Sequence, residues 1–282
     1  MKLPDHIALL DSLGDLQTGN TSPILVCGSH CGGTRDLARH VKSCRVKAVF
    51  LNNAGVGKNQ AGIRGLTNYE AENILACAVD HNSAEIGIAR DTWESGIVSH
   101  TSAQAEKAGV CVGDTVKEAV TKIINIVDLP SSTPIMNRSD SPIEEKEESY
   151  GKVDLKKQTQ IQIDGINITV TDSITFLNEN NAEHIVVCGS HGGLSAGEYA
   201  LKYRLKAVFF NDAGIGKNMA GVKSLELLNH AGIIACTVNS MSAEIFNGHD
   251  VLENGIISAC NQLATTKNIK EGMMVKEVIR LI

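Results

Sequence analysis

The chain carries one succession of four segments twice, and this repetition limits the possible folds more than any other feature. The first copy reads ILVCGSHCGG, KAVFLNNAGVGKNQAGI, ILACAVDHNSAEI and WESGIVS, and the second reads IVVCGSHGG, KAVFFNDAGIGKNMAGV, IIACTVNSMSAEI and LENGIIS. Order and spacing both agree, because Cys27 and Cys188 lie 161 residues apart and Lys58 and Lys217 lie 159 apart. The sequence therefore predicts a tandem duplication of one folding unit.

A polar segment separates the two copies. Residues 129–156 are rich in Pro, Ser and charged residues and poor in branched apolar ones, so they cannot bury enough surface to offset their chain entropy. We predict a first α/β repeat at residues 1–128, a flexible polar linker at 129–156 and a second repeat at 157–282. We expect an intramolecular pseudo-dimer; a homo-oligomer and two independently folded units are the other arrangements that a repeat allows.

Each copy alternates short apolar runs with helical patterns. The runs of the first copy are His6–Leu10, Ile24–Cys27, Lys47–Leu51, Ile74–Val79 and Ile97–Ser99, and the helical patterns are Thr34–Cys44, Gln60–Asn73, Ala84–Glu94, Thr101–Lys107 and Gly113–Val127. In the second copy, Asp164–Gly165 predicts a hairpin turn within residues 160–170, and Glu271–Ile282 a closing helix. This alternation predicts an α/β fold, namely two tandem repeats of a three-layer α/β/α, Rossmann-like or flavodoxin-like unit with a mainly parallel sheet. The strand order stays open.

Composition excludes some classes of protein. The chain of 282 residues is 43% hydrophobic and 21% charged, as in a globular domain, and its net charge of −6 argues against a nucleic acid or an anionic membrane as partner. No apolar run approaches the ~18 residues of a membrane span, and the N-terminus lacks a signal-peptide pattern. We therefore expect a cytoplasmic protein. Several of its eight cysteines lie in apolar runs, where free Cys acts as a small hydrophobe, so a disulfide scaffold is not expected.

Polar motifs follow three of the expected strands in both copies. The segments CGSH, NNAGVGK and DHNSAE come directly after the runs that begin at Ile24, Lys47 and Ile74. Because ligands of open α/β sheets bind beyond the carboxyl ends of the strands, we expect these motifs to share one rim of the sheet. This placement predicts the site for any strand order.

The first motif is a glycine-rich turn that contains a Ser-His pair. Its glycines could present backbone amides to an anion or a polarised carbonyl, and the ligand-binding candidates are Gly28, Gly32, Gly33, Gly189, Gly192 and Gly193. The catalytic candidates are Ser29, His30, Ser190 and His191. The alternative is a tight turn without a ligand. Only half of the G-x-S-x-G nucleophile elbow is present, so a Ser29 nucleophile would need a base from another loop.

The second motif places a lysine behind closely spaced glycines. It is not an ATP-binding loop, because Asn52 replaces the required first Gly, Asn59 follows the Lys, and both copies depart alike. Lys58 and Lys217 are therefore candidates for a catalytic amine or for an ammonium that binds carboxylate or phosphate, with a solvated loop lysine as the alternative. The ligand-binding candidates of this motif are Asn52, Gly55, Gly57, Asn211, Gly214 and Gly216.

The third motif contains Ser-Ala-Glu. Glu85 and Glu244 are candidates for a general base, although a serine N-cap with an acid in the first helical turn explains the same pattern. The copies also differ: Asn53, His81 and His100 of the first correspond to Asp212, Ser240 and Ala259 of the second. Asp212 joins the catalytic candidates and His81 the ligand-binding ones, since these differences favour composite sites between the copies over the loss of one site.

Metals and cofactors are not expected. Cys27, His30 and Cys31 lie close in sequence, but the second copy lacks the second Cys, which argues against zinc. The leading hypothesis is a cofactor-independent hydrolase or lyase that acts on an anionic or carbonyl-bearing metabolite. The alternatives are a non-catalytic nucleotide- or metabolite-binding sensory module with duplicated pockets, and an assembly protein in which the glycines serve a pseudo-symmetric interface.

Overall fold

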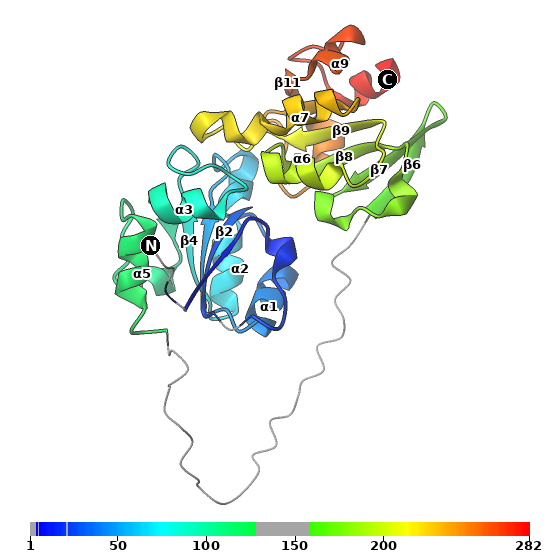
Figure 1. The fold of residues 1–282 in the computed structure, drawn as a ribbon. Helices are drawn as coiled ribbons and strands as arrows, with labels where there is room; N and C mark the ends of the chain where they lie inside the picture. The colour runs from blue at the N-terminus through cyan, green and yellow to red at the C-terminus, as the bar shows by residue number, and fades with distance from the viewer. Residues whose placement is uncertain (1–3, 5, 21, 128–157) are drawn as a thin grey trace, which may run out of the picture.

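A computed structural model describes residues 4, 6–20, 22–127 and 158–282 (Figure 1). Two separate sheets, each with its own helices, form an N-terminal unit up to residue 127 and a C-terminal unit from residue 158. The predicted linker at 129–156 lies outside the described residues. Within the described part of the chain, no helix is long and apolar enough to span a membrane.

The N-terminal sheet has five strands in sequence order. They are β1 (Ile7–Leu10), β2 (Ile24–His30), β3 (Ala48–Asn52), β4 (Leu75–Val79) and β5 (Val98–Thr101). The first four strands run parallel, and β5 pairs antiparallel with β4. The helices are η1 (Leu13–Asp15), α1 (Arg35–Ser43), η2 (Lys58–Ile63), α2 (Gly65–Ala71), α3 (Ala89–Ser95), α4 (Ala103–Lys107) and α5 (Val116–Ile123), where η marks a 3-10 helix.

The C-terminal sheet repeats this order and adds one strand at its edge. Its strands are β6 (Gln158–Ile163), β7 (Ile166–Thr171), β8 (Ile185–His191), β9 (Ala207–Asn211), β10 (Ile234–Val238) and β11 (Ile257–Cys260). Strands β7 to β10 are parallel, and β6 forms the predicted hairpin with β7 through Asp164 and Gly165, both at positive φ. The helices are η3 (Ile174–Phe176), η4 (Glu179–Asn181), α6 (Leu194–Ala200), η5 (Lys217–Val222), α7 (Ser224–His230), α8 (Gly248–Asn254), α9 (Gln262–Thr266), α10 (Val275–Val278) and η6 (Ile279–Leu281).

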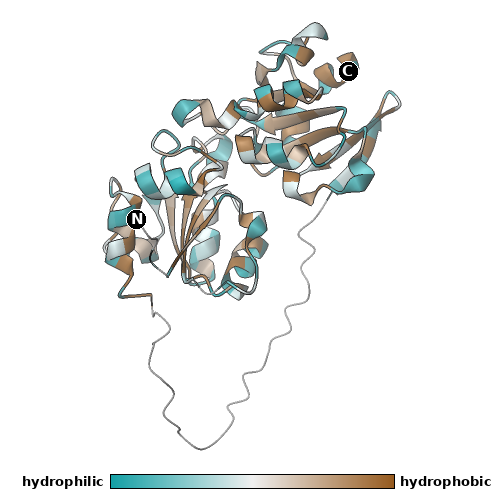
Figure 2. Cartoon of the chain, viewed as in Figure 1, coloured by the Kyte–Doolittle hydropathy of each residue, from teal (hydrophilic) through white to brown (hydrophobic). Residues whose placement is uncertain are grey.

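Helices cover both faces of each sheet. Alternate strand residues point to opposite faces: Ile24 packs with Trp93 of α3, whereas Leu25 packs with Val41 of α1. Figure 2 shows the apolar strands between more polar helices. The predicted α/β architecture with a mainly parallel sheet is therefore confirmed. The consecutive strand order, however, differs from the Rossmann and flavodoxin orders, which reverse direction, so that part of the expectation is wrong.

Two of the helices expected from sequence begin later than predicted. Ser83 does not cap a helix: its hydroxyl donates to Asp80 O at 2.7 Å and accepts from Ile97 N at 2.9 Å, so residues 80–87 form turns and α3 begins at Ala89. The segment 242–247 has the same arrangement. The pattern from Gln60 to Asn73 is also interrupted, because η2 contains residues at positive φ and α2 starts only after it. The sequence-based explanation of Ser-Ala-Glu as a helix start is therefore wrong.

Candidate functional site

The strand-end motifs of each unit meet at one rim, and the two rims face each other. Asn52 Nδ2 at the end of β3 donates to Ala84 O at 3.0 Å, and the loop after β4 is bonded to the end of β2 through Gly87 N and Gly28 O at 2.7 Å. Two backbone hydrogen bonds then cross between the units, from Lys58 N to Ser240 O and from Lys217 N to His81 O, both 2.8 Å long. The polar rims are thus the surfaces through which the units touch.

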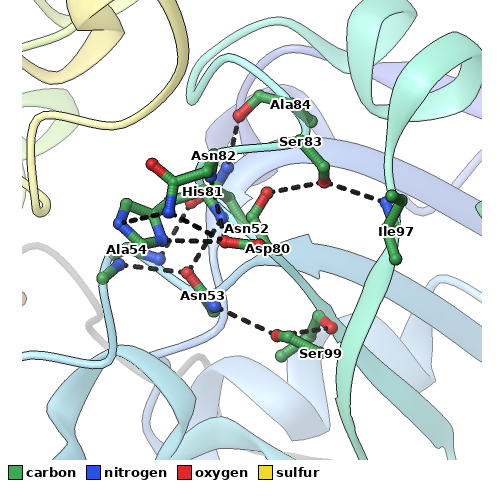
Figure 3. A network of polar contacts seen from close by, with 12 residues as sticks. Asn52, Asn53, Ala54, Asp80, His81, Asn82, Ser83, Ala84, Ile97 and Ser99 are labelled. Carbon is green, nitrogen blue, oxygen red and sulfur yellow. Dashed lines mark hydrogen bonds and ion pairs between the residues drawn. The ribbon is translucent and has the colours of Figure 1, made fainter. Parts of the chain in front are cut away.

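A left-handed loop follows β3 and another follows β9. Ala54 to Gly57 all have φ between +48° and +69°, a conformation that costs energy for Val56 because it is β-branched. Side chains hold the loop: Asn52 Oδ1 accepts from Ala54 N at 2.8 Å and Asn53 Oδ1 from Gly55 N at 3.0 Å (Figure 3). The loop 213–216 is held in the same way by Asn211 and Asp212.

These two loops contact each other directly. A Cβ added to Gly55 would lie 2.9 Å from Gly214 Cα, so the two backbones touch with no side chain between them. The amides of Gly57 and Gly216 donate to the carbonyls of Gly55 and Gly214 at 2.7 Å. The glycine amides proposed to bind a ligand are therefore hydrogen-bonded within their own loops, and the loops form part of the contact between units.

Both candidate lysines form ion pairs across this contact. Lys58 Nζ lies 2.8 and 2.9 Å from the carboxylate oxygens of Asp250, and Lys217 Nζ lies 2.7 and 2.9 Å from those of Asp91. Burial raises the pKa of Asp91, but hydrogen bonds from Lys217 and from the Glu85 amide outweigh burial and leave that pKa below its ordinary value. The two pairs are reciprocal, since each unit supplies one lysine and one aspartate.

The candidate glutamates also form ion pairs and hydrogen bonds across the contact between the units. Glu85 accepts from Asn218 Nδ2 at 2.7 Å and pairs with Lys223 of the other unit. Glu244 does the same towards the N-terminal unit, accepting from Asn59 Nδ2 at 2.8 Å and from Arg64 at 2.6 Å. The pKa values of both carboxyls are lowered, since these contacts outweigh the opposing effect of burial.

The reciprocal ion pairs give a first prediction. In a double-mutant cycle of Lys58→Ala and Asp250→Ala, we expect a coupling free energy of about 1–2 kcal/mol, above that of an exposed pair because both side chains are largely buried. Urea unfolding of the four proteins measures it. The matched control is Arg90 and Glu94, an exposed pair inside α3, for which about 0.3 kcal/mol is expected. Equal coupling in both cycles would contradict the interface role.

The two candidate histidines end β2 and β8 and lie between the units. Only 8% of His30 and 7% of His191 is exposed. The ring of His30 lies 5.6 Å from the ring of Phe246, which belongs to the other unit. A Cβ added to Gly87 would likewise lie 3.3 Å from His191 Cε1. Each histidine thus contacts the opposite unit.

Hydrogen bonding fixes the tautomer of both rings. The amide of Gly32 donates to His30 Nδ1, and the amide of Gly193 to His191 Nδ1, each at 3.1 Å. Because Nδ1 accepts, the proton of the neutral ring sits on Nε2. Burial lowers the pKa of His30 to about 3, with a further contribution from His191, and lowers the pKa of His191 to about 4. Neither Nε2 has a hydrogen-bond partner among the described residues.

The candidate serines hold the backbone of their own units. Ser29 Oγ accepts from Leu13 N, and Ser190 Oγ from Ile174 N, each at 2.9 Å. These bonds anchor η1 and η3 to the ends of β2 and β8. Each serine directly precedes its histidine in sequence. Its hydroxyl nevertheless accepts from one backbone amide, while the histidine Nδ1 accepts from another.

The glycines of the Ser-His turns are closely surrounded. An added Cβ would come within 2.7 Å of another heavy atom at every one of these positions: Gly28, Gly32, Gly33, Gly189, Gly192 and Gly193. At Gly28 and Gly189 the neighbours are backbone atoms of residues 87–88 and 246–247. Gly28 and Gly189 therefore let the loops after β4 and β10 pack on the strand ends.

One of the three differences between the units, at His81, lies at this contact. Asn53 donates through Nδ2 to Ser99 Oγ at 3.0 Å (Figure 3). At the equivalent place Asp212 has a carboxylate, which accepts from Ser240 N. His81 has its ring against Gly214 of the other unit, and its Nδ1 lies 3.0 Å from Asp80 Oδ1 without hydrogen-bond geometry. His100 lies beside Ser99 on β5.

Three kinds of residue at this contact are not among the candidates predicted from the sequence. Asp91 and Asp250 neutralise the lysines, Asn59, Asn218, Arg64 and Lys223 hold the glutamates, and Phe246 covers His30. A signal was available for the aspartates, because they recur at the 159-residue offset of the lysines.

No protein-family model, curated protein or solved structure matches this chain. Among the residues that the structure describes, no group of three or more His, Cys, Asp or Glu side chains is arranged to hold a metal ion. The two histidines and the contact around them are the features of this chain that bear on its function.

Proposed function

We propose that the chain is a duplicated, cytoplasmic small-molecule enzyme with a composite site between its units. The observation that supports the proposal is the pair of buried, neutral imidazoles whose Nε2–H groups lack a partner among the described residues. Neither Nε2 is among the buried side-chain atoms that lack a partner, so both N–H groups are accessible to solvent and to a ligand. A ligand oxygen between the rings would accept from His30 and His191 together.

The chemistry of these rings favours donation over proton abstraction. With pKa values of about 3 and 4, His30 and His191 are weak bases near neutral pH but remain hydrogen-bond donors. A neutral imidazole can polarise a carbonyl group, and two of them can stabilise developing negative charge on one oxygen. We propose that the substrate is an anionic or carbonyl-bearing metabolite and the reaction a cofactor-independent hydrolysis or lyase step.

The pseudo-dimer is part of the proposal. Two units of equal strand order meet through reciprocal contacts, as expected of an isologous interface between duplicated copies. A single unit would offer only one of the two imidazoles. The fused pair would therefore form the site within one chain.

A non-catalytic binding module is the second candidate. The rim carboxylates, which would supply a general base, are occupied by lysine, arginine and asparagine of the opposite unit. A site built from two donors binds an oxygen equally well without turning it over. The two candidates differ in turnover and not in the residues that bind.

The test measures binding and turnover separately. Imidazole ¹⁵N spectra with added acetate, pyruvate or phosphate report binding, and hydrolysis of p-nitrophenyl acetate reports turnover. We expect one of these anions to shift both Nε2 signals, and kcat/KM to fall roughly 100-fold or more in His30→Phe/His191→Phe, since loss of an oxyanion donor costs about that much. His249→Gln, at an exposed position on α8, is the control. Shifts without turnover support the binding module; neither shifts nor turnover contradicts both candidates.

A further inference from the structure

Two thiols of the C-terminal unit lie in contact on neighbouring strands. Cys236 of β10 and Cys260 of β11 are direct partners in the antiparallel ladder, and their Sγ atoms are 3.4 Å apart. Neither residue belongs to the site between the units. The pair is therefore an independent chemical feature.

The backbone around the pair suits a covalent bond between the sulfurs. Asn261 N donates to Ala235 O at 2.9 Å, one step outside the pair, so Cys236 and Cys260 form a non-hydrogen-bonded pair. In such a pair the Cα atoms lie roughly 4.5 Å apart, within the range of about 4.4–6.8 Å found in disulfides. The strands can thus accept the bond without separating or sliding.

The two thiols differ in access. Cys236 is fully buried, whereas Cys260 is partly exposed and borders a groove of about 590 Å³ that Asn229 and His230 of α7 also line. The hydrogen bond from Cys236 lowers the pKa of the Cys260 thiol, which favours its reactive thiolate. An external reagent would meet Cys260 first and leave Cys236 to complete the reaction.

We propose that Cys236 and Cys260 form a dithiol site that low-molecular-weight disulfides oxidise to an intrachain disulfide. The Cys260 thiolate attacks one sulfur of the reagent RSSR, forming a mixed disulfide and releasing RS⁻. Cys236 then gives its proton to the released RS⁻ and attacks Cys260 Sγ, forming the protein disulfide. The second RS⁻ leaves and takes up from solvent the proton that Cys260 had lost. Two protein thiols are oxidised, and one reagent disulfide is reduced to two thiols.

The N-terminal unit provides an internal control. At the equivalent register, Cys77 faces Thr101 instead of a second cysteine. The same strand geometry therefore exists there without the chemistry. Installing the missing thiol with Thr101→Cys should create a second site of the same kind.

The experiment uses the folded full chain with Cys111→Ser, which removes the exposed thiol. This protein is treated with oxidised glutathione. Differential alkylation and peptide mass spectrometry should show one Cys236–Cys260 linkage per chain, while the fully buried Cys27 stays reduced. Cys236→Ala should stop at a glutathione adduct on Cys260, Cys260→Ser should abolish reaction, and Thr101→Cys should yield a second linkage. Native protein in which both cysteines remain alkylatable after excess reagent would overturn the proposal, as would an adduct on Cys260 that Cys236 does not resolve.

Discussion

Gly221→Ala is expected to lower the free energy of unfolding by at least about 3 kcal/mol, measured by urea denaturation. A Cβ at this position would lie 1.9 Å from Asp212 O and 3.2 Å from Ile215 Cα, which are backbone atoms of the left-handed loop after β9. Backbone cannot rotate away as a side chain can, so the loop must move. Since that loop touches Gly55 of the other unit, the change would also disturb the contact between the units.

Two controls separate steric overlap from other effects of removing a glycine. Gly62→Ala tests the equivalent place in the N-terminal unit, where the added Cβ would lie 2.2 Å from Asn53 O, and a similar loss is expected. Gly19→Ala places the methyl group in open space and should change stability by no more than about 0.5 kcal/mol. If Gly221→Ala changed the free energy of unfolding as little as Gly19→Ala, that result would contradict the close packing of the loop on η5.

Much of the fold could be predicted because β-branched runs mark buried parallel strands. The run predicted at Ile24–Cys27 is the start of β2, and the run at Lys47–Leu51 corresponds to β3 at Ala48–Asn52. The strand order could not be predicted, because apolar periodicity reports burial but not which strand is a neighbour. The sequence predicts a helix in place of the turn after β4, because Ser83 and Glu85 have capping chemistry. In the structure the Ser83 hydroxyl instead donates to Asp80 O and accepts from Ile97 N.

The candidate site illustrates a limit of reasoning from repeats. Because Lys58 and Lys217 recur in both copies, the sequence predicts a chemical role for them. The two lysines do lie at corresponding positions of the rim. A reciprocal interface requires the same residues in both copies, so recurrence alone cannot separate a ligand site from a contact between units. Only the three-dimensional position of Asp91 and Asp250 shows that the lysines are paired.

Among the candidate residues, His30 and His191 have the environment that differs most from the one expected from the sequence. Sequence suggested proton transfer, but burial and the amides of Gly32 and Gly193 keep His30 and His191 neutral with the proton on Nε2. Burial of this kind depends on the opposite unit and has no local sequence signal. Phe246, which covers His30 at a positive φ of 61° where the other unit has Gly87, shows that the two imidazoles are not equivalent.

Acid is expected to destabilise the protein in a pH range where carboxylates contribute little. The pKa values of His30 and His191 fall from 6.5 to about 3 and about 4 on folding, so the unfolded chain binds more protons than the native state below pH 6.5. The free energy of unfolding therefore has its full value above pH 6.5 and decreases as the pH falls towards the folded-state pKa values of the two rings. One pKa unit corresponds to about 1.4 kcal/mol, which gives a loss of about 2 kcal/mol per ring, or about 4 kcal/mol together, at pH 5.

Urea unfolding at intervals from pH 8 to pH 4.5 measures this loss, and the carboxylates can be separated from it. The lowered pKa values of Glu85, Asp91 and their counterparts also give stability that is lost in acid, but only as pH falls below about 4.5, the ordinary range of these groups. His30→Gln/His191→Gln cannot titrate at these positions, so its unfolding free energy should vary little between pH 6.5 and pH 4.5. If the wild type were equally flat over this range, the rings could not be buried and neutral, and the donor role proposed for them would fail with it.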